Sequence, residues 1–225
     1  MEAILVNQPR VFPRRKFHQI IKRFVDLTLC ILGLPFAVPV MIICALAIHF
    51  DDPQGSVLFI QKRLGKGGRP FQIYKFRTMK INSDDIRCQT FMKAYVRGEI
   101  GVDEEEKEIY KPVETQQILR IGHILRKTSL DELPQIINVL KGEMSLIGPR
   151  PNVPWEVDAY QPWHYERMEV LPGITGLAQV RGRSSISFNS LVRYDIEYVE
   201  NQSLALDLKI LWWTVITTIK GKGVV

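Results

Sequence analysis

The sequence predicts an α+β, mostly helical fold for a monotopic membrane protein, which enters a membrane from one side only. An apolar segment at residues 24–50 lies between two basic flanks, and it predicts an N-terminal re-entrant helix hairpin. A Gly-rich turn between two stretches of strand composition predicts a short β-hairpin. Later apolar residues at helical spacing predict interfacial amphipathic helices.

The composition is that of a folded protein with an anionic partner. The 225 residues are 46% hydrophobic and 24% charged, which excludes a disordered tail. The formal net charge of +6 favours lipid headgroups, a phosphorylated substrate or nucleic acid as partner. The cysteines at positions 30, 44 and 88 form no Cys-x-x-Cys or Cys/His cluster, so neither a disulfide framework nor a zinc site is indicated.

The apolar segment at 24–50 is long enough to cross a bilayer but is interrupted in the middle. As a straight helix the residues from Leu27 onward would measure about 36 Å, against about 30 Å for a hydrocarbon core. Gly33, Pro35 and Pro39 cluster near its centre, and each interior proline costs about 3 kcal/mol in a regular helix. We therefore expect a kink there.

The flanks of this segment favour a return to the same side. Residues 10–23 carry six Lys or Arg, residues 61–80 carry seven, and neither stretch contains an acid. The positive-inside rule marks both as cytoplasmic, which a single crossing cannot satisfy. The sequence thus predicts a re-entrant helix at the cytoplasmic face of the inner (plasma) membrane, preceded by a basic N-terminal segment at 1–23.

A β-hairpin is expected next, from strands at 57–60 and 71–76 around the turn Gly65–Gly68. Its basic and aromatic residues could stack on single-stranded nucleic acid, but beside a membrane segment a rim facing lipid headgroups is favoured. No nucleic acid partner is therefore predicted.

The C-terminal part predicts two helices. The first carries its apolar residues at helical spacing, namely Phe188, Leu191, Val192, Ile196 and Val199. The second is Leu204–Ile219, whose Trp212 and Trp213 favour a membrane interface, with a buried core helix as the alternative. Asp195 and Asp207 are interpreted as caps or ion pairs rather than catalysts.

The stretch KTSLDELPQIINVLKGEMSLIGPRP places Asp131 beside Glu132 and admits two interpretations. In the first, Ser129 and Glu132 form a capping box, but Pro134 would then fall inside the helix and remove a backbone hydrogen bond. In the second, the helix starts near Pro134 and ends at Gly142, so the two carboxylates lie at or just before its start. Spacing alone favours a structural role for both acids.

A proline-framed arginine follows in the loop Gly148-Pro149-Arg150-Pro151. Two prolines stiffen the backbone, and a stiff loop can aim one guanidinium, whose planar fork suits phosphate. A solvated arginine on an ordinary turn is the alternative. The Gly-rich stretch at 171–183 could likewise offer backbone N–H groups to an anion.

Five ordered blocks resemble the bacterial sugar transferases, also called monotopic phosphoglycosyl transferases, in their minimal form. The blocks are KRFVDL before the apolar segment, QKRLGKGGRPFQIYKFRTM, LRKTSLDELPQIINVLKGEMSLIGPRP, LPGITGLAQVRGR and YVENQSLALDLKILWWTV. The resemblance implies transfer of a sugar 1-phosphate from a UDP-sugar to a polyprenol phosphate, expected to be undecaprenyl phosphate. The products would be UMP and a polyprenyl diphosphate sugar, in the first membrane step of glycan assembly.

The resemblance also implies residue roles within a cytosolic, interfacial catalytic domain at 51–225. Asp131 would be the nucleophile that forms an aspartyl phosphosugar, and Glu132 would contribute to an Mg²⁺ site. A carboxylate attacking a diphosphate needs such neutralising charge. The phosphate contacts would be Arg126, Gly148, Pro149 and Arg150.

Two other functions are weighed against this one. A non-catalytic, basic membrane-surface protein would bind anionic lipid without turnover, and a phosphohydrolase would use the same carboxylates with water as acceptor. The sugar, the polyprenol length, the glycan pathway and the oligomeric state are not written in these features, and a homodimer is one of the open arrangements.

Overall fold

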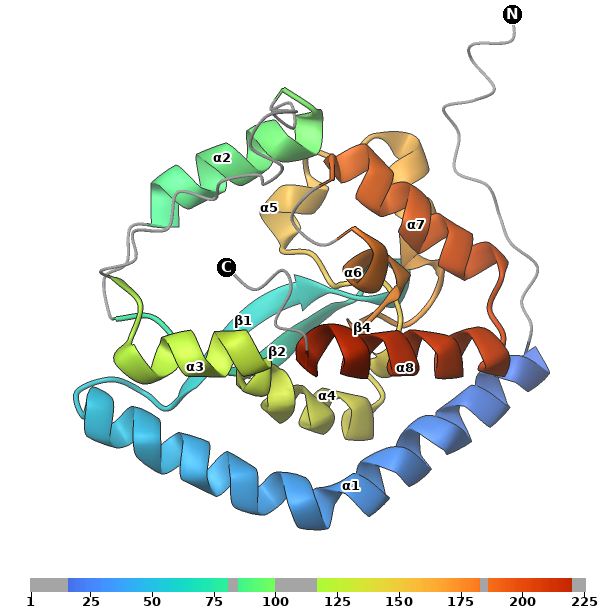
Figure 1. The fold of residues 1–225 in the computed structure, drawn as a ribbon. Coiled ribbons are helices and arrows are strands. Elements are labelled where there is room, and N and C mark those ends of the chain that lie inside the picture. The colour runs from blue at the N-terminus through green and yellow to red at the C-terminus, as the bar shows by residue number, and fades with distance from the viewer. Residues whose placement is uncertain (1–15, 81–84, 100–116, 183–185, 220–225) are drawn as a thin grey trace, which may run out of the picture.

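The computed structural model describes residues 16–80, 85–99, 117–182 and 186–219. A long helix, α1, runs along one side of a mixed body of helices with two small sheets (Figure 1). The elements in chain order are α1 Lys16–Asp51, β1 Leu58–Leu64, η2 Lys66–Gly68, β2 Pro70–Phe76, α2 Asp85–Arg97, α3 Arg120–Thr128, η4 Leu130–Gln135, α4 Ile136–Lys141, β3 Ser145–Ile147, α5 Pro154–Val157, η5 Pro162–Glu169, β4 Gly173–Thr175, α6 Leu177–Arg181, α7 Phe188–Glu200 and α8 Leu204–Ile219. The predicted class, mostly helical with a small sheet, is confirmed.

Helix α1 contains Pro35 and Pro39 and is bent near its middle, so that both ends rise toward the body of the protein (Figure 1). The bend agrees with the kink that the prolines predict, because each removes a backbone hydrogen bond. The helix begins at Lys16, earlier than the expected 24, and it is one bent helix rather than two antiparallel arms. Entry into a single leaflet stays a prediction.

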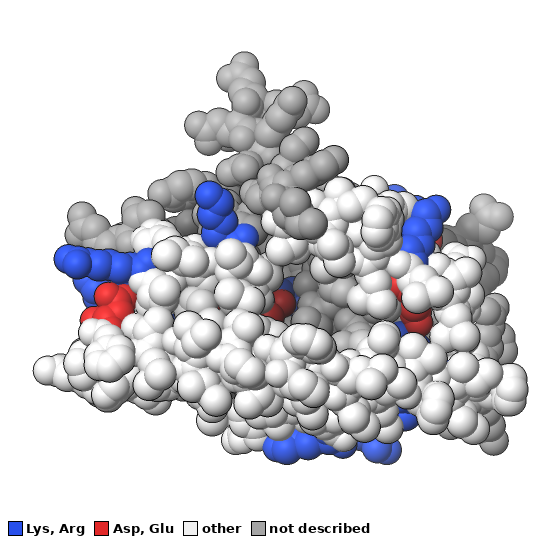
Figure 2. Space-filling model, turned by 60° about the horizontal axis from the view of Figure 1, so that its bottom comes forward, with Lys and Arg blue, Asp and Glu red and all other residues white. Residues whose placement is uncertain are grey.

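The surface of α1 is apolar over a broad band, with Lys and Arg at its margins (Figure 2). Side chains more than half exposed along it are Phe17, Ile20, Phe24, Ile31, Leu32, Phe36, Ile42, Ile43, Leu46 and Phe50. By length and composition, α1 is the one helix in the described part of the chain that could cross a membrane. Such an exposed apolar face is compatible with membrane association.

The predicted β-hairpin is present and longer than expected. Strands β1 and β2 pair antiparallel from Leu58 opposite Phe76 to Leu64 opposite Pro70. At the turn, Gly67 and Gly68 take φ values of 62° and 74°, which glycine adopts without steric cost.

A second sheet, which the sequence did not predict, pairs β3 with β4 in parallel. Beyond it the chains approach backbone to backbone: a Cβ on Gly148 would collide with the Leu171 carbonyl oxygen, and one on Gly173 or Gly176 would collide with the backbone of Gly148. Glycine is the residue that permits this approach.

Helices α7 and α8 appear where the sequence placed them, and α8 has the predicted bounds. Ile210 on α8 is fully buried, while Leu208 and Trp212 are 63% and 65% exposed. One face of α8 thus packs in the core, and its opposite face is apolar and exposed. Asp195 pairs with Arg167 and Asp207 pairs with Lys22, so both form ion pairs as expected.

Candidate active site

The two adjacent carboxylates lie in η4, between α3 and α4. Ser129 separates α3 from η4 in a left-handed conformation with φ 57°, which costs a non-glycine residue about 1 kcal/mol. Its side chain caps nothing, so the capping-box interpretation is wrong. Helix α4 ends at Gly142, as the second interpretation predicted, and Asp131 and Glu132 precede its first turn. We call this stretch, Arg120–Lys141, the helical segment.

Glu132 is held by two cations. Its Oε1 accepts hydrogen bonds from Lys75 Nζ at 2.5 Å and from Arg150 Nη1 at 3.2 Å. Burial by itself raises the pKa of Glu132, but Lys75 and Arg150 outweigh it and lower that pKa to about 2. Glu132 is therefore ionised at all physiological pH values.

Asp131 has a different environment. Its carboxylate has no hydrogen bond or ion pair to any side chain in the part of the chain that the structure describes. Burial and the neighbouring charge of Glu132 raise its pKa, and Lys75, Arg150 and Arg126 oppose that rise. Two neighbouring carboxylates with pKa values pushed apart are typical of a pair with separate chemical roles.

Arg126 approaches the pair from the last turn of α3. Its Nε donates to Thr78 Oγ1 at 3.0 Å, and its charge is one of those that lower the pKa of Asp131. Within the described residues this hydrogen bond uses only Nε, so the two terminal nitrogens of the guanidinium could donate to an anion.

The loop that carries Arg150 is held at four consecutive carbonyl groups. Gly173 N–H donates to Pro149 O at 2.9 Å and Leu64 N–H donates to Asn152 O at 2.9 Å. Between them, Arg167 Nη2 donates to Arg150 O at 3.0 Å and Arg63 Nη1 donates to Pro151 O at 3.1 Å. The predicted stiff loop is thus confirmed, and its rigidity comes from these bonds as well as from the prolines.

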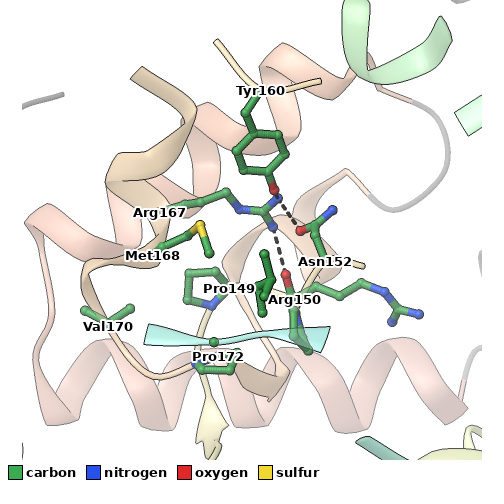
Figure 3. A pocket seen from close by; sticks show the side chains of 11 residues that line it. Pro149, Arg150, Asn152, Tyr160, Arg167, Met168, Val170 and Pro172 are labelled. Carbon is green, nitrogen blue, oxygen red and sulfur yellow. Dashed lines mark hydrogen bonds between the residues drawn. The ribbon is translucent and has the colours of Figure 1, made fainter. Parts of the chain in front are cut away.

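Arg167 is the centre of this support (Figure 3). It is 2% exposed, pairs with Asp195 at 2.5 Å, and also donates to Asn152 Oδ1 and to the Tyr160 hydroxyl. The Arg150 guanidinium points away from Arg167 (Figure 3). Its Nη1 donates to the carboxylate of Glu132. Arg167 therefore supports the loop from behind while Arg150, half exposed, faces the site.

The structure brings together Asp131, Glu132, Arg126 and Arg150, which the sequence proposed as one site. Gly148 and Pro149 are buried, and their backbone groups bond Thr175 O and Gly173 N–H. They shape the loop, and a direct phosphate contact by either one stays a prediction.

Sequence reasoning missed three basic residues, Lys75, Arg63 and Arg167. Lys75 and Arg63 line a small opening together with Glu132 and Arg150. A signal for Lys75 was available, because strand alternation places it on the same face as the buried Ile73. A lysine on an inward face calls for a charged partner. Arg167 gave no such signal, because η5 has no clear period.

Glu132 is a chemically suitable ligand for Mg²⁺, and in the described part of the chain few other metal-binding side chains lie near it. No group of three or more His, Cys, Asp and Glu side chains gathers among the described residues. Mg²⁺ accepts such a site, since one or two carboxylates, substrate phosphates and water satisfy its octahedral shell. Within the described residues, Glu132 Oε2 accepts no hydrogen bond and could bind the ion.

The sequence of this chain is similar to those of known proteins. A family model described as bacterial sugar transferase matches residues 17–221. The galactosyl transferase CpsE of Streptococcus agalactiae serotype III (strain NEM316) is 37% identical over 92% of this chain and 44% of its own length. A UDP-N-acetylgalactosamine-undecaprenyl-phosphate N-acetylgalactosaminephosphotransferase of Aeromonas hydrophila is 37% identical over 90% of this chain and 44% of its own length.

A third relative has a similar length. The protein named uncharacterized sugar transferase EpsL of Bacillus subtilis (strain 168) is 38% identical over 91% of this chain and 90% of its own length. The chain thus spans less than half the length of the first two relatives and most of the third.

Proposed function

The chain belongs to the bacterial sugar transferase family, and from that premise we propose that it transfers a sugar 1-phosphate from a UDP-sugar to a polyprenol phosphate. The name of the Aeromonas relative, which specifies a UDP-sugar and undecaprenyl phosphate, supports both substrate classes. One observation carries the proposal: among the residues that the structure describes, the Asp131 carboxylate has no bonded side-chain partner, while Glu132 beside it is bonded to Lys75 and Arg150.

In the first half-reaction, an Asp131 carboxylate oxygen attacks the phosphorus that bears the sugar. A P–O bond to Asp131 forms, the P–O bond to the bridging diphosphate oxygen breaks, and UMP leaves with that electron pair. Arg150 and Arg126 would bind the phosphoryl oxygens, since Arg150 bonds Glu132 and the charge of Arg126 acts on Asp131. Asp131 must be ionised for this step.

In the second half-reaction, an oxygen of the polyprenol phosphate attacks the same phosphorus. The bond to Asp131 breaks, the free carboxylate returns, and the product is a polyprenyl diphosphate sugar. The cycle is ping-pong, because UMP departs before the lipid reacts.

Glu132 would hold Mg²⁺ through Oε2, with donor phosphates and water as the remaining ligands. The ion would supply neutralising charge at the diphosphate oxygens. Lys75 bonds Glu132 and keeps its carboxylate ionised.

A panel of UDP-sugars with undecaprenyl phosphate, assayed for UMP release and lipid product, tests the function. The proposal expects UMP in step with a lipid-linked sugar diphosphate for at least one donor. Free sugar phosphate without lipid would instead identify a phosphohydrolase. Absence of UMP with every donor would favour a non-catalytic membrane-surface protein.

We expect chelation of divalent cations to stop UMP release. EDTA should lower the rate by about a hundredfold or more, because the negative charge of the donor would stay unneutralised. Added Mg²⁺ should restore the rate, and Ca²⁺ should restore it poorly because it is larger and prefers more ligands. A full rate in EDTA would contradict the metal assignment.

The pH profile should reveal the ionisation of Asp131. UMP release should fall as the pH drops through the raised pKa of Asp131, while Glu132 stays ionised down to about pH 2. Lys75→Met removes a charge that lowers the pKa of Asp131, so the acidic limb of kcat should move to higher pH. Lys75→Arg retains the charge and should shift the limb less. An unmoved limb in Lys75→Met would contradict this assignment.

We further propose that α1 enters only the cytoplasmic leaflet. Its bend and exposed apolar side chains support this position, which would keep the carboxylates near the headgroups. Single cysteines placed in residues 10–15 and at Gln54, with Cys30, Cys44 and Cys88 replaced by serine, should react with an impermeant thiol reagent from the same membrane face. Labelling of the two sites from opposite faces would show a full crossing.

A further inference from the structure

The two halves of α1 pack against opposite ends of the helical segment. Cys30, in the first half, shares a core with Val139 of α4. Cys44 and Ile48, in the second half, share another core with Leu125 of α3. Leu130 and Leu133 of η4, the turn between α3 and α4, also pack against this second core. Between the two cores, Gly33 has nothing near its Cβ position. α1 therefore contacts the helical segment at both ends and, from its second half, at the central turn.

A side chain of α1 completes the hydrogen bonding at each of these ends. At the start of α3, Leu119 supplies no side-chain cap, and Asp51 Oδ2 accepts the Ile121 N–H at 3.2 Å. At the end of α4, Arg23 donates to Val139 O at 2.6 Å and to Leu140 O at 3.0 Å. An anion at a helix start and a cation at a helix end are the signs that the helix dipole favours.

The bend is what allows one helix to reach both ends. As a straight helix, the stretch from Arg23 to Asp51 would measure about 42 Å. The stretch from Ile121 to Leu140 measures no more than about 32 Å even if α3, η4 and α4 were collinear. The bend near Pro35 and Pro39 shortens the end-to-end distance of α1, so its geometry matches that of the helical segment (Figure 1).

Asp131 and Glu132 lie between these two attachment points, in the short turn η4. We propose that α1 is a brace for the active site, with Arg23 and Asp51 as positioning residues that set where the two carboxylates stand. This inference rests on the proposed function, since the position of Asp131 matters through its attack on phosphorus. Small displacements of a reacting group lower the rate steeply, while donor binding by Arg150 is less affected.

The test compares Arg23→Met, Arg23→Lys and Asp51→Asn with a matched control, Arg97→Met. Arg97 is 59% exposed at the end of α2, so its replacement removes a similar side chain away from the brace. Each full-length variant is measured in the same detergent for UMP release and for amide hydrogen exchange.

The brace predicts faster exchange at residues 129–135 in Arg23→Met, with the hairpin β1–β2 as protected as in the unaltered chain. It also predicts a fall in kcat of about tenfold or more with the KM for the donor little changed. Arg23→Lys should recover part of the rate. Asp51→Asn, like Arg23→Met, should speed exchange at residues 129–135 and lower kcat.

Three outcomes would overturn the brace: unchanged exchange at residues 129–135, a uniform rise in exchange across the protein, or a kcat equal to that of Arg97→Met. Failure of the unaltered chain to release UMP would overturn the proposed function instead. The exchange measurement needs no turnover, so it would still show whether Arg23 and Asp51 hold residues 129–135 in place.

Discussion

Replacement of Asp131 by asparagine is expected to lower UMP release by about a thousandfold or more, because it removes the attacking oxygen's charge. Asparagine has nearly the same shape, and the Asp131 carboxylate has no bonded partner among the described residues, so the fold should be unaffected. Denatured mass spectrometry after mixing with donor should find a sugar phosphate on the Asp131 peptide of the unaltered chain and none in the variant.

Glu132→Gln is the matched control for this prediction. It should also be slow, because glutamine removes the charged metal ligand and weakens the bonds from Lys75 and Arg150, but Asp131 would remain able to form the covalent adduct. An adduct on Glu132, or full activity in Asp131→Asn, would end the assignment of Asp131 as nucleophile.

Arg167→Met should cause the largest loss of stability. The change leaves Asp195 buried and without its ion-pair partner, and breaking a buried pair costs about 3 to 5 kcal/mol. For a chain of this size that loss corresponds to a fall in Tm of roughly 10 °C. Thermal unfolding in detergent, followed by tryptophan fluorescence, measures it.

Arg181→Met is the matched control, because Arg181 pairs with Glu197 on the surface, where a pair is worth about 1 kcal/mol or less. The Tm of Arg167→Lys should lie between those of Arg167→Met and Arg181→Met. Lysine keeps the charge but lacks the planar guanidinium that bonds Arg150 O, Asn152 and Tyr160. Equal Tm values for Arg167→Met and Arg181→Met would contradict the role of Arg167.

Local patterns in the sequence predicted the elements that depend on local interactions. Apolar periodicity predicted α7, an apolar stretch with two tryptophans predicted α8, the Gly-rich turn predicted the β-hairpin, and Gly142 predicted the end of α4. The parallel pair β3–β4 was missed because each strand has only three residues and its partner lies far along the chain. Long-range pairing leaves little mark in so short a stretch.

The acidic centre of the site could be proposed from sequence, but its basic surroundings could not. Asp131 and Arg150 belong to blocks with a recognisable family pattern, whereas Arg167 acts through burial and through partners on other elements. The spacing of Ser129 to Glu132 fits a cap, which is one of the two interpretations open from sequence, but the left-handed conformation of Ser129 depends on how α3 meets η4. Only the three-dimensional arrangement decides such a case.

The glycine contacts beside Arg150 have a consequence for how this scaffold can be adapted to different sugars. Because Gly148, Gly173 and Gly176 meet backbone to backbone, no side chain can be introduced there without separating the loop from β4. That junction therefore fixes the position of the loop that carries Arg150, and it offers no position at which a new side chain could be selected. Mutational libraries aimed at donor choice should leave it unaltered and vary positions whose side chains have room to change.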